Sequence, residues 1–205
     1  MSSRRTALAF LATAAAIVAN AQVQRPDDQI IEAFNAIVDV VAERQAELQG
    51  DICARYELVD KYIGPHFDFA SASLNILRRE HWPDDPIEQT RFAEAFYDSL
   101  VADYGDLLIH FNSETLQVSR LEANPSSNPL WINGLLRFND GTTADVRFRV
   151  YYSGDRWGII DVRADSLAYS KDFRAQFLEH IYEHGFDSLI AELERKAAKR
   201  RRCSV

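Results

Sequence analysis

The stretch RWGIIDVRADSLAYSKDFRAQFLEHIYEHGFDSLIAEL, from Arg156 to Leu193, contains the change from strand to helix that decides the fold. A β-type run ends near Val162, a short turn follows, and a helical pattern with aromatic residues on one side continues to Gly185. A second amphipathic helical pattern follows this glycine. We therefore expect a last strand whose C-terminal helices fold back over one face of a sheet, with any ligand held between helices and sheet.

The first 21 residues have the composition of an export signal. Arg4 and Arg5 precede an apolar run from Ala7 to Val18, and Ala19-Asn20-Ala21 has the small residues of a cleavage site. The apolar run is shorter than the roughly 20 residues that a membrane-spanning helix needs. We expect a signal peptide over residues 1–21 and a mature chain that is exported to the periplasm.

The charge and length of the chain limit its class. The formal net charge is −8, with 31 acidic and 23 basic residues. Because nucleic-acid binding relies on Lys and Arg that displace counterions, this balance argues against a nucleic-acid partner. The mature chain has the length of one domain, which we place at residues 22–195, with a basic C-terminal tail at residues 196–205.

Two cysteines, Cys53 and Cys203, could form a disulfide in an oxidising compartment. Cys203 lies in the basic tail, beside the run Lys199-Arg200-Arg201-Arg202, which we expect to be mobile. Whether the two cysteines pair is therefore left open by the sequence.

The chain before residue 111 reads as helical. Pro86 after Asp85, with Glu88 three residues beyond the capping position, predicts a helix start, and one aromatic face continues from there to Phe111. The expected helices cover Asp27–Leu48, Ile52–Ile63, Phe67–Arg79 and a long one from Asp85 to Phe111.

The period changes to two between Thr115 and Asp165, which predicts four strands with hairpin turns at Asn139-Asp140-Gly141 and Ser153-Gly154-Asp155. We expect three-residue loops at both turns, because two-residue loops would place Asn133 and Asp161 opposite Phe148. The residues expected on the apolar face are Ile132, Gly134, Leu136, Val146, Phe148, Val150, Gly158, Ile160 and Val162. Glycine inside a strand often marks close approach of a ligand or of another backbone.

Two motifs suggest chemistry without supporting it. His180-Ile181-Tyr182-Glu183-His184 matches the H-x-x-E-H pattern of inverted zinc proteases, but a third ligand is missing and an exposed helix face explains the pair better. His66 with Asp68, and His110, could be acid–base groups, yet no spacing identifies a catalytic base. We therefore expect no catalytic residue, no metal and no cofactor.

Several strings, in this order and spacing, resemble the MlaC family, whose members are also described as toluene-tolerance auxiliary proteins. These strings are Tyr62–Phe69, Phe92–Phe96 with Leu100 and Tyr104, Trp157 with Ile160–Val162 and Ser166, Tyr169–Phe173, and Gly185–Ile190. The resemblance extends from about Ile30 to Leu193.

The resemblance implies a periplasmic carrier whose partners are a phospholipid, an inner-membrane Mla ABC transporter complex and an outer-membrane lipoprotein complex. It also implies an α+β fold of the MlaC and nuclear-transport-factor type. In this fold a four-stranded antiparallel sheet is wrapped by helices around an apolar cavity of roughly 1,000 Å³. We expect the cavity wall to contain Phe96, Leu100, Tyr104, Ile132, Gly134, Val146, Phe148, Gly158, Ile160, Phe173 and Phe177.

For each of these residues, plain packing in a filled core is the competing interpretation. Two other functions also stay open: a small-molecule enzyme on a similar cone-shaped fold, and a non-catalytic scaffold that binds membrane proteins.

Overall fold

A computed structural model describes residues 24–111, 113–121, 127–165 and 167–203 of the chain. The expected signal peptide lies outside the described residues. The longer helices are α1 (Pro26–Glu43), α2 (Gln45–Gly50), α3 (Ile52–Tyr62), α4 (Phe69–Leu77), α5 (Pro86–Tyr104), α6 (Tyr169–His184) and α7 (Phe186–Lys196). Short helical segments are η1 (Gly64–His66), η2 (Gly105–His110) and α8 (Ala198–Arg201). No helix in the described part is long and apolar enough to cross a membrane.

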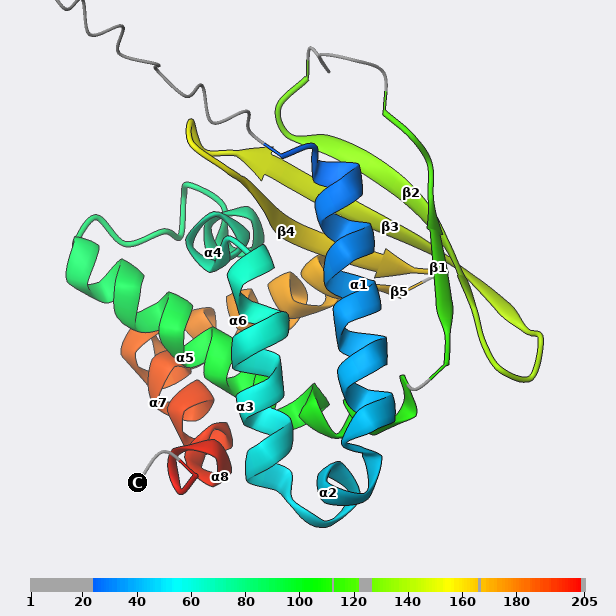
Figure 1. The fold of residues 1–205 in the computed structure, drawn as a ribbon. Helices are drawn as coiled ribbons and strands as arrows, with labels where there is room; N and C mark the ends of the chain where they lie inside the picture. Colours follow the sequence, from blue (N-terminus) through cyan, green and yellow to red (C-terminus); the bar gives the residue numbers. More distant parts are fainter. Residues whose placement is uncertain (1–23, 112, 122–126, 166, 204–205) are drawn as a thin grey trace, which may run out of the picture.

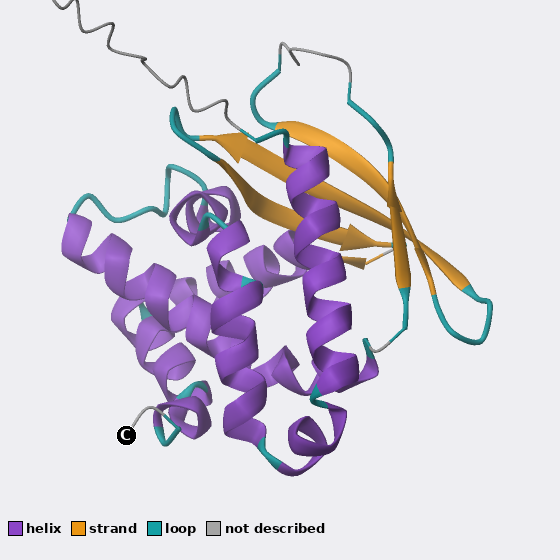
Figure 2. Ribbon diagram, in the orientation of Figure 1, coloured by secondary structure: helices purple, strands orange, loops and turns teal. Residues whose placement is uncertain are grey.

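One antiparallel sheet has the strand order β1-β2-β3-β4-β5 (Figure 1). Its strands are β1 (Thr115–Val118), β2 (Leu130–Arg137), β3 (Thr143–Tyr152), β4 (Trp157–Ala164) and the two-residue β5 (Leu167–Ala168). Figure 2 shows the helices gathered on one side of the sheet. The predicted α+β fold with four main strands is confirmed, and β5 adds a short fifth.

The first hairpin has the predicted register. Phe138 and Thr142 are joined by a 2.9 Å backbone hydrogen bond, which leaves a three-residue loop with Gly141 at φ +84°. Ile132 lies opposite Phe148, and Gly134 lies opposite Val146. The alternation of apolar and polar residues was therefore sufficient to align β2 with β3.

The second hairpin differs from the prediction. Ser153 donates to the Arg156 carbonyl at 3.1 Å, so the loop has two residues instead of three. A β-bulge shifts the register, because Arg149 pairs with Asp161 and Val150 pairs with Ile159, which leaves Ile160 of β4 as the additional residue. Val162 therefore still lies opposite Phe148. The inward residue opposite Val150 is Ile159, which the prediction did not include, while Gly158 lies opposite Tyr151.

Two predicted helices are each divided in the structure. The first breaks at Arg44, where α2 begins a new axis. The long helix ends at Tyr104 and continues as the 3₁₀ segment η2, although its start is as predicted, with Asp85 accepting from the Ile87 amide at 2.9 Å. The remaining helices lie close to their predicted ranges.

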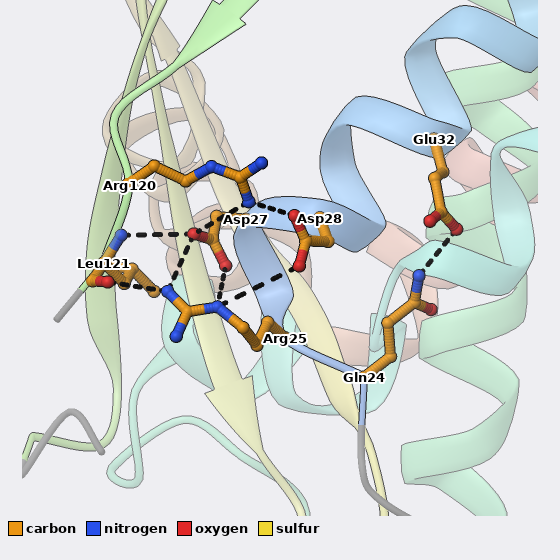
Figure 3. Close-up of polar contacts among 7 residues, drawn as sticks. All are labelled: Gln24, Arg25, Asp27, Asp28, Glu32, Arg120 and Leu121. Atoms are coloured by element: carbon orange, nitrogen blue, oxygen red, sulfur yellow. Dashed lines mark hydrogen bonds and ion pairs between the residues drawn. The ribbon is translucent and has the colours of Figure 1, made fainter. Parts of the chain in front are cut away.

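The start of α1 is fixed to the sheet by a buried carboxylate (Figure 3). Asp27 is fully buried and accepts from Arg25 at 3.2 and 3.0 Å and from the Leu121 amide at 3.2 Å. Arg120 pairs with Asp28 beside it. Burial alone would raise the pKa of Asp27, but the hydrogen bonds from Arg25 and Leu121 outweigh it and hold the pKa below its ordinary value.

The C-terminal segment is fixed as well, which corrects the expectation of a mobile tail. Cys203 forms a disulfide with Cys53 on α3, across 150 residues of sequence. Arg200 on α8 pairs with Asp60 at 2.6 Å and with Asp98 at 2.8 Å. Both cysteines and the arginine therefore hold α8 against α3 and α5.

Candidate functional site

An apolar pocket of about 280 Å³ lies between α4, α5, β4 and α6. Its walls are formed by Phe67, Phe69, Ala72, Ile76, Phe96, Leu100, Tyr104, Leu107, Ile160, Asp161, Val162, Tyr169, Ser170 and Phe173. Five separate elements contribute, namely α4, α5, η2, β4 and α6, so the pocket exists only in the folded chain. Its residue types can bind an apolar ligand by contact alone.

Helix α5 supplies the wall and one side of the rim. Phe96, Leu100 and Tyr104 are four residues apart, so they lie on one face of the helix. Tyr104 is 41% exposed and Leu107, in η2, is 51% exposed, which marks this end as the open one. The Tyr104 and Tyr169 rings meet edge to face at 6.2 Å, and burial together with Tyr169 raises the pKa of the Tyr104 hydroxyl.

The polar part of the wall is a hydrogen-bonded pair. Ser170 on α6 donates to the Asp161 carboxylate on β4 at 2.8 Å, and both residues are 6% exposed. Arg163 lies 3.6 Å from the same carboxylate oxygen. Ser170 and Asp161 therefore hold each other within the wall, and the other polar atoms of the lining side chains are the hydroxyls of Tyr104 and Tyr169.

Five of the residues predicted for the cavity line this pocket. They are Phe96, Leu100, Tyr104, Ile160 and Phe173. The other six lie elsewhere: Ile132, Gly134, Val146, Phe148, Gly158 and Phe177. The pocket therefore contains predicted residues of α5, β4 and α6, and their role as lipid contacts stays a prediction.

The lack of a side chain at Gly158 allows the start of α4 to pack against β4, and Gly158 does not line the pocket. A Cβ atom at this position would lie 2.6 Å from the Asp68 Cβ and 3.2 Å from the Asp68 amide nitrogen. Asp68 begins α4, donates its amide to the Ile159 carbonyl at 3.0 Å, and accepts from the Ser71 amide at 3.0 Å. A side chain at Gly158 would therefore displace the start of α4.

The central sheet residues pack against β1 and α1. A Cβ at Gly134 would lie 3.1 Å from Leu116 and 3.6 Å from Phe148, so side chains of the protein already occupy the space above it. Ile132 is 1% exposed and Val146 is 7% exposed. Phe148 lines a separate apolar cavity of about 150 Å³, which Phe67 also lines.

Phe177 belongs to a filled aromatic cluster. Its ring lies 5.9 Å from Phe92, 5.5 Å from Phe96 and 5.6 Å from Phe173. Helix α7 closes this cluster from the other side through Leu189 and further apolar residues. The aromatic face of α6 therefore borders the pocket at Phe173, whereas one turn later, at Phe177, it lies in the filled cluster.

The wall contributed by α4 was missed. Phe69, Ala72 and Ile76 line the pocket, whereas the sequence analysis named no residue of this helix for the cavity wall. Their spacing of three and four residues is helical and was a usable signal. Helix α4 starts two residues later than expected, at Phe69, and the cap at Asp68 sets which face turns inward.

The histidines do not form a metal site in the described residues, where no group of three or more His, Cys, Asp or Glu residues could hold a metal ion. The His180 and His184 rings are 5.0 Å apart, and His180 Nε2 is 3.1 Å from the Ser188 hydroxyl. Burial and Arg156 lower the pKa of His66, whose Nδ1 is 3.3 Å from the Gln29 amide nitrogen.

The fold and the pocket define an α+β protein that encloses an apolar site between the helices and one end of a sheet. The model of the family described as "MlaC protein" matches residues 32–195, and the chain belongs to this family. The resemblance inferred from the sequence is thus confirmed.

Two known proteins show the likeness in detail. The chain is 25% identical to "Toluene tolerance protein ttg2D" of Pseudomonas putida over 161 residues, which cover 73% of this chain and 74% of that protein. Its fold is similar to that of a phospholipid-binding protein from Ralstonia solanacearum, solved in complex with a phospholipid. That similarity has a TM-score of 0.76 at 19% identity and covers 87% of this chain and 99% of the other.

Proposed function

We propose that this protein is a periplasmic phospholipid carrier that holds acyl chain in the pocket between α4, α5, β4 and α6. The membership in the MlaC family supports this function, and the structural neighbour from Ralstonia solanacearum binds a phospholipid. The expected export signal at residues 1–21 agrees with a periplasmic location.

The observation that carries the proposal is the chemistry of the pocket wall. Apart from Asp161 and Ser170, which bind each other, and the hydroxyls of Tyr104 and Tyr169, the lining side chains are apolar. Acyl chains offer no hydrogen bonds, so such a wall suits them, whereas an enzyme substrate needs polar groups that orient it. A non-catalytic carrier therefore fits this pocket better than an enzyme.

The energetics explain why a carrier must enclose its cargo. Each methylene moved from water to an apolar site gains about 0.8 kcal/mol, so long acyl chains cannot cross an aqueous compartment unprotected. A membrane and an apolar pocket are similar environments for the chains. Transfer between them can therefore be close to neutral in free energy and needs no chemical step.

The volume of the pocket is smaller than a phospholipid requires. Its volume of about 280 Å³ is far below the roughly 1,000 Å³ expected for a phospholipid site. Phe67 lines both this pocket and the neighbouring cavity of about 150 Å³. We infer that loading widens the pocket, with the Phe67 ring turning so that the two spaces join.

As partners we propose the complexes that the family resemblance implies, an inner-membrane Mla ABC transporter and an outer-membrane lipoprotein complex. The rim at Tyr104 and Leu107 is the exposed end of the pocket, through which a lipid would enter or leave. Transfer at either membrane would then require this rim to face the partner.

Solvent extraction of the gently purified mature protein, followed by mass spectrometry, tests the proposal. We expect diacyl phospholipid at close to one molecule per chain. The Ala72→Phe change, at a wall residue that is 6% exposed, should reduce this occupancy several-fold. Ala70→Phe, on the exposed side of the same helix, is the matched control and should retain lipid.

Wild-type protein without lipid would refute the carrier and favour a scaffold with a filled core. Lipid that remains at full occupancy in a folded Ala72→Phe variant would refute the location of the site. Co-purification of a small polar metabolite instead of lipid would favour an enzyme.

A further inference from the structure

Helix α6 separates the apolar pocket from a second, polar groove. Tyr169 and Phe173 line the pocket, Lys171 and Arg174 line the groove, and Ser170 lines both. The groove has a volume of about 520 Å³ and lies at the outer edge of β4. Its lining residues are Leu74, Asn75, Arg78, Arg149, Asp161, Arg163, Ser170, Lys171 and Arg174.

The groove has the opposite charge to the rest of the molecule. Five of its lining residues are basic and Asp161 alone is acidic, in a chain with a formal net charge of −8. Asp161 already accepts from Ser170 and lies near Arg163. Its charge therefore offsets only a fraction of the positive charge that surrounds the groove.

Two of the arginines are held in place by neutral groups, and Arg163 is held by an aromatic ring and the Asp161 carboxylate. Arg174 donates to the Ile76 and Asn75 carbonyls at 2.9 and 2.7 Å, and Arg149 donates to the Asn75 side chain at 2.8 Å. Arg163 stacks 4.4 Å from the centre of the Trp131 ring. A guanidinium has five N–H donors, so these contacts fix each group in position and leave other donors for a ligand.

The cations of the groove also repel one another. Burial lowers the pKa of Arg174, and the nearby charges of Arg78 and Arg149 lower it further, while Asp161 acts in the opposite direction. Arg163 Nε is buried and has no hydrogen-bond partner among the described residues. A bound anion would relieve this repulsion.

Arg78 occupies a backbone conformation that ordinary side chains avoid. Its φ of 61° and ψ of 167° lie in a region that is populated almost only by glycine. Strain of this kind persists where the side chain has a use, and Arg78 follows the last residue of α4 at the edge of the groove. The conformation places one more cation beside Arg149 and Arg174.

We propose that the groove is a binding site for a phosphate group. Several fixed guanidinium groups match the oxygens of a phosphate, and a concave site admits a protruding group but not a flat surface. An extended anionic membrane would in addition be repelled by the acidic remainder of the chain.

The phosphate has two possible sources, a phospholipid headgroup or a free phosphate. Asp161 and Ser170 line both the groove and the pocket, so this hydrogen-bonded pair is the wall between a lipid in the pocket and the groove. This source rests on the proposed carrier function. A free phosphate would enter from solvent without regard to the pocket.

Calorimetric titration of inorganic phosphate at low ionic strength tests the site, with lipid-stripped and lipid-loaded full-length mature protein. We expect a dissociation constant below about 1 mM for the stripped protein. Arg163→Gln and Arg78→Gly should each weaken binding about tenfold, because each removes a charge-assisted contact. Arg137→Gln, at the end of β2 and outside the groove, should leave binding unchanged.

Arg78→Gly separates loss of the site from loss of the fold. Glycine accepts the backbone conformation at this position, so the melting temperature should stay the same or rise while phosphate affinity falls. Unchanged affinity in both groove variants would refute the site. A hexaglutamate peptide that binds more than tenfold tighter than phosphate would refute the phosphate assignment in favour of an acidic protein segment.

Comparison of the two protein forms identifies the source. Binding to the stripped form only indicates that the lipid headgroup fills the groove, and equal binding to both indicates a free phosphate. Absence of binding to the stripped form refutes the groove even if lipid co-purifies, which leaves the carrier intact. Phosphate binding by a chain that never carries lipid refutes the carrier and leaves the groove.

Discussion

The two ends of α5 carry similar apolar side chains but differ in packing. One end lies in a filled cluster, and the other borders the pocket. Around Phe92 the space is filled: its ring lies 5.5 Å from Phe186 and 5.9 Å from Phe177, and it is fully buried. Around Leu100, which packs against the same cluster on one side, the helix borders the pocket. Large apolar residues along one helix can therefore produce either a core or a cavity.

The difference comes from what lies opposite each end. Helix α7 brings Leu189, Ile190 and Leu193 against the Phe92 end, which closes the cluster. At the Leu100 end the opposing elements are α4, β4 and the first turn of α6, and the Ser170–Asp161 pair holds α6 to β4. The pocket thus lies between elements that are joined at the Ser170–Asp161 pair, whereas α7 fills the space beside Phe92.

The largest effect should come from the filled end. Phe92→Ala should reduce the free energy of unfolding by about 3–5 kcal/mol, because it removes a fully buried ring and leaves a cavity. Urea denaturation followed by circular dichroism measures this loss. A change below about 1 kcal/mol would mean that the Phe92 end is also loosely packed.

The third side of α5, where α8 packs, should give the next largest effect. Replacing Cys53 and Cys203 by serine removes a disulfide across 150 residues and should cost about 2–4 kcal/mol of stability. Reduction of the wild-type protein should have the same effect in thermal unfolding. Lipid occupancy should persist at low temperature, because neither cysteine lines the pocket.

A smaller effect is expected at the hollow end. Leu100→Ala should cost about 1–2 kcal/mol, at or below the lower limit of the usual range for buried leucines, because this side chain already borders empty space. The same urea titration provides the comparison with Phe92→Ala. Equal losses for the two variants would contradict the distinction between a filled and a hollow end.

The smallest loss of stability at neutral pH should come from a change at Asp27, the buried carboxylate in Figure 3, which lies outside α5. This loss should also depend on pH. The pKa of Asp27 is lower in the folded protein, so its stabilising contribution is present above the unfolded pKa of about 3.9 and is lost as pH falls through the folded value.

Chemical denaturation at a series of pH values from 7 down to 2 tests this contribution. The stability difference between wild type and Asp27→Asn should therefore shrink in acid. Asp39→Asn, at an exposed position of the same helix, is the control. A difference that stays constant over this pH range would contradict the role of Asp27.

The sequence predicted the structure best where a local pattern is compatible with a single backbone conformation. Asn139-Asp140-Gly141 predicted the first loop, and Gly141 does adopt positive φ. The second hairpin allowed two solutions, a longer loop or a short loop with a bulge, and adjacent Ile159 and Ile160 fit either. The alternation of apolar and polar residues cannot reveal one additional residue in a strand when the two residues at that point, Ile159 and Ile160, are both apolar.

The pocket was harder to predict than the fold, for a related reason. Phe173 and Phe177 lie one turn apart on α6 and both pack against the cluster that α7 closes, yet of the two only Phe173 also borders the pocket. Pairing of Cys53 with Cys203 likewise depends on α8 reaching α3. Such properties come from long-range packing, which the local sequence does not encode.

The bulge in β4 has a consequence for how the interior is divided. Ile159 lines the cavity shared with α1, and Ile160, the next residue, lines the pocket shared with α5. A regular strand would direct one of these side chains outward, because successive residues point to opposite faces. One additional residue therefore allows a single strand to serve as the common wall of two compartments.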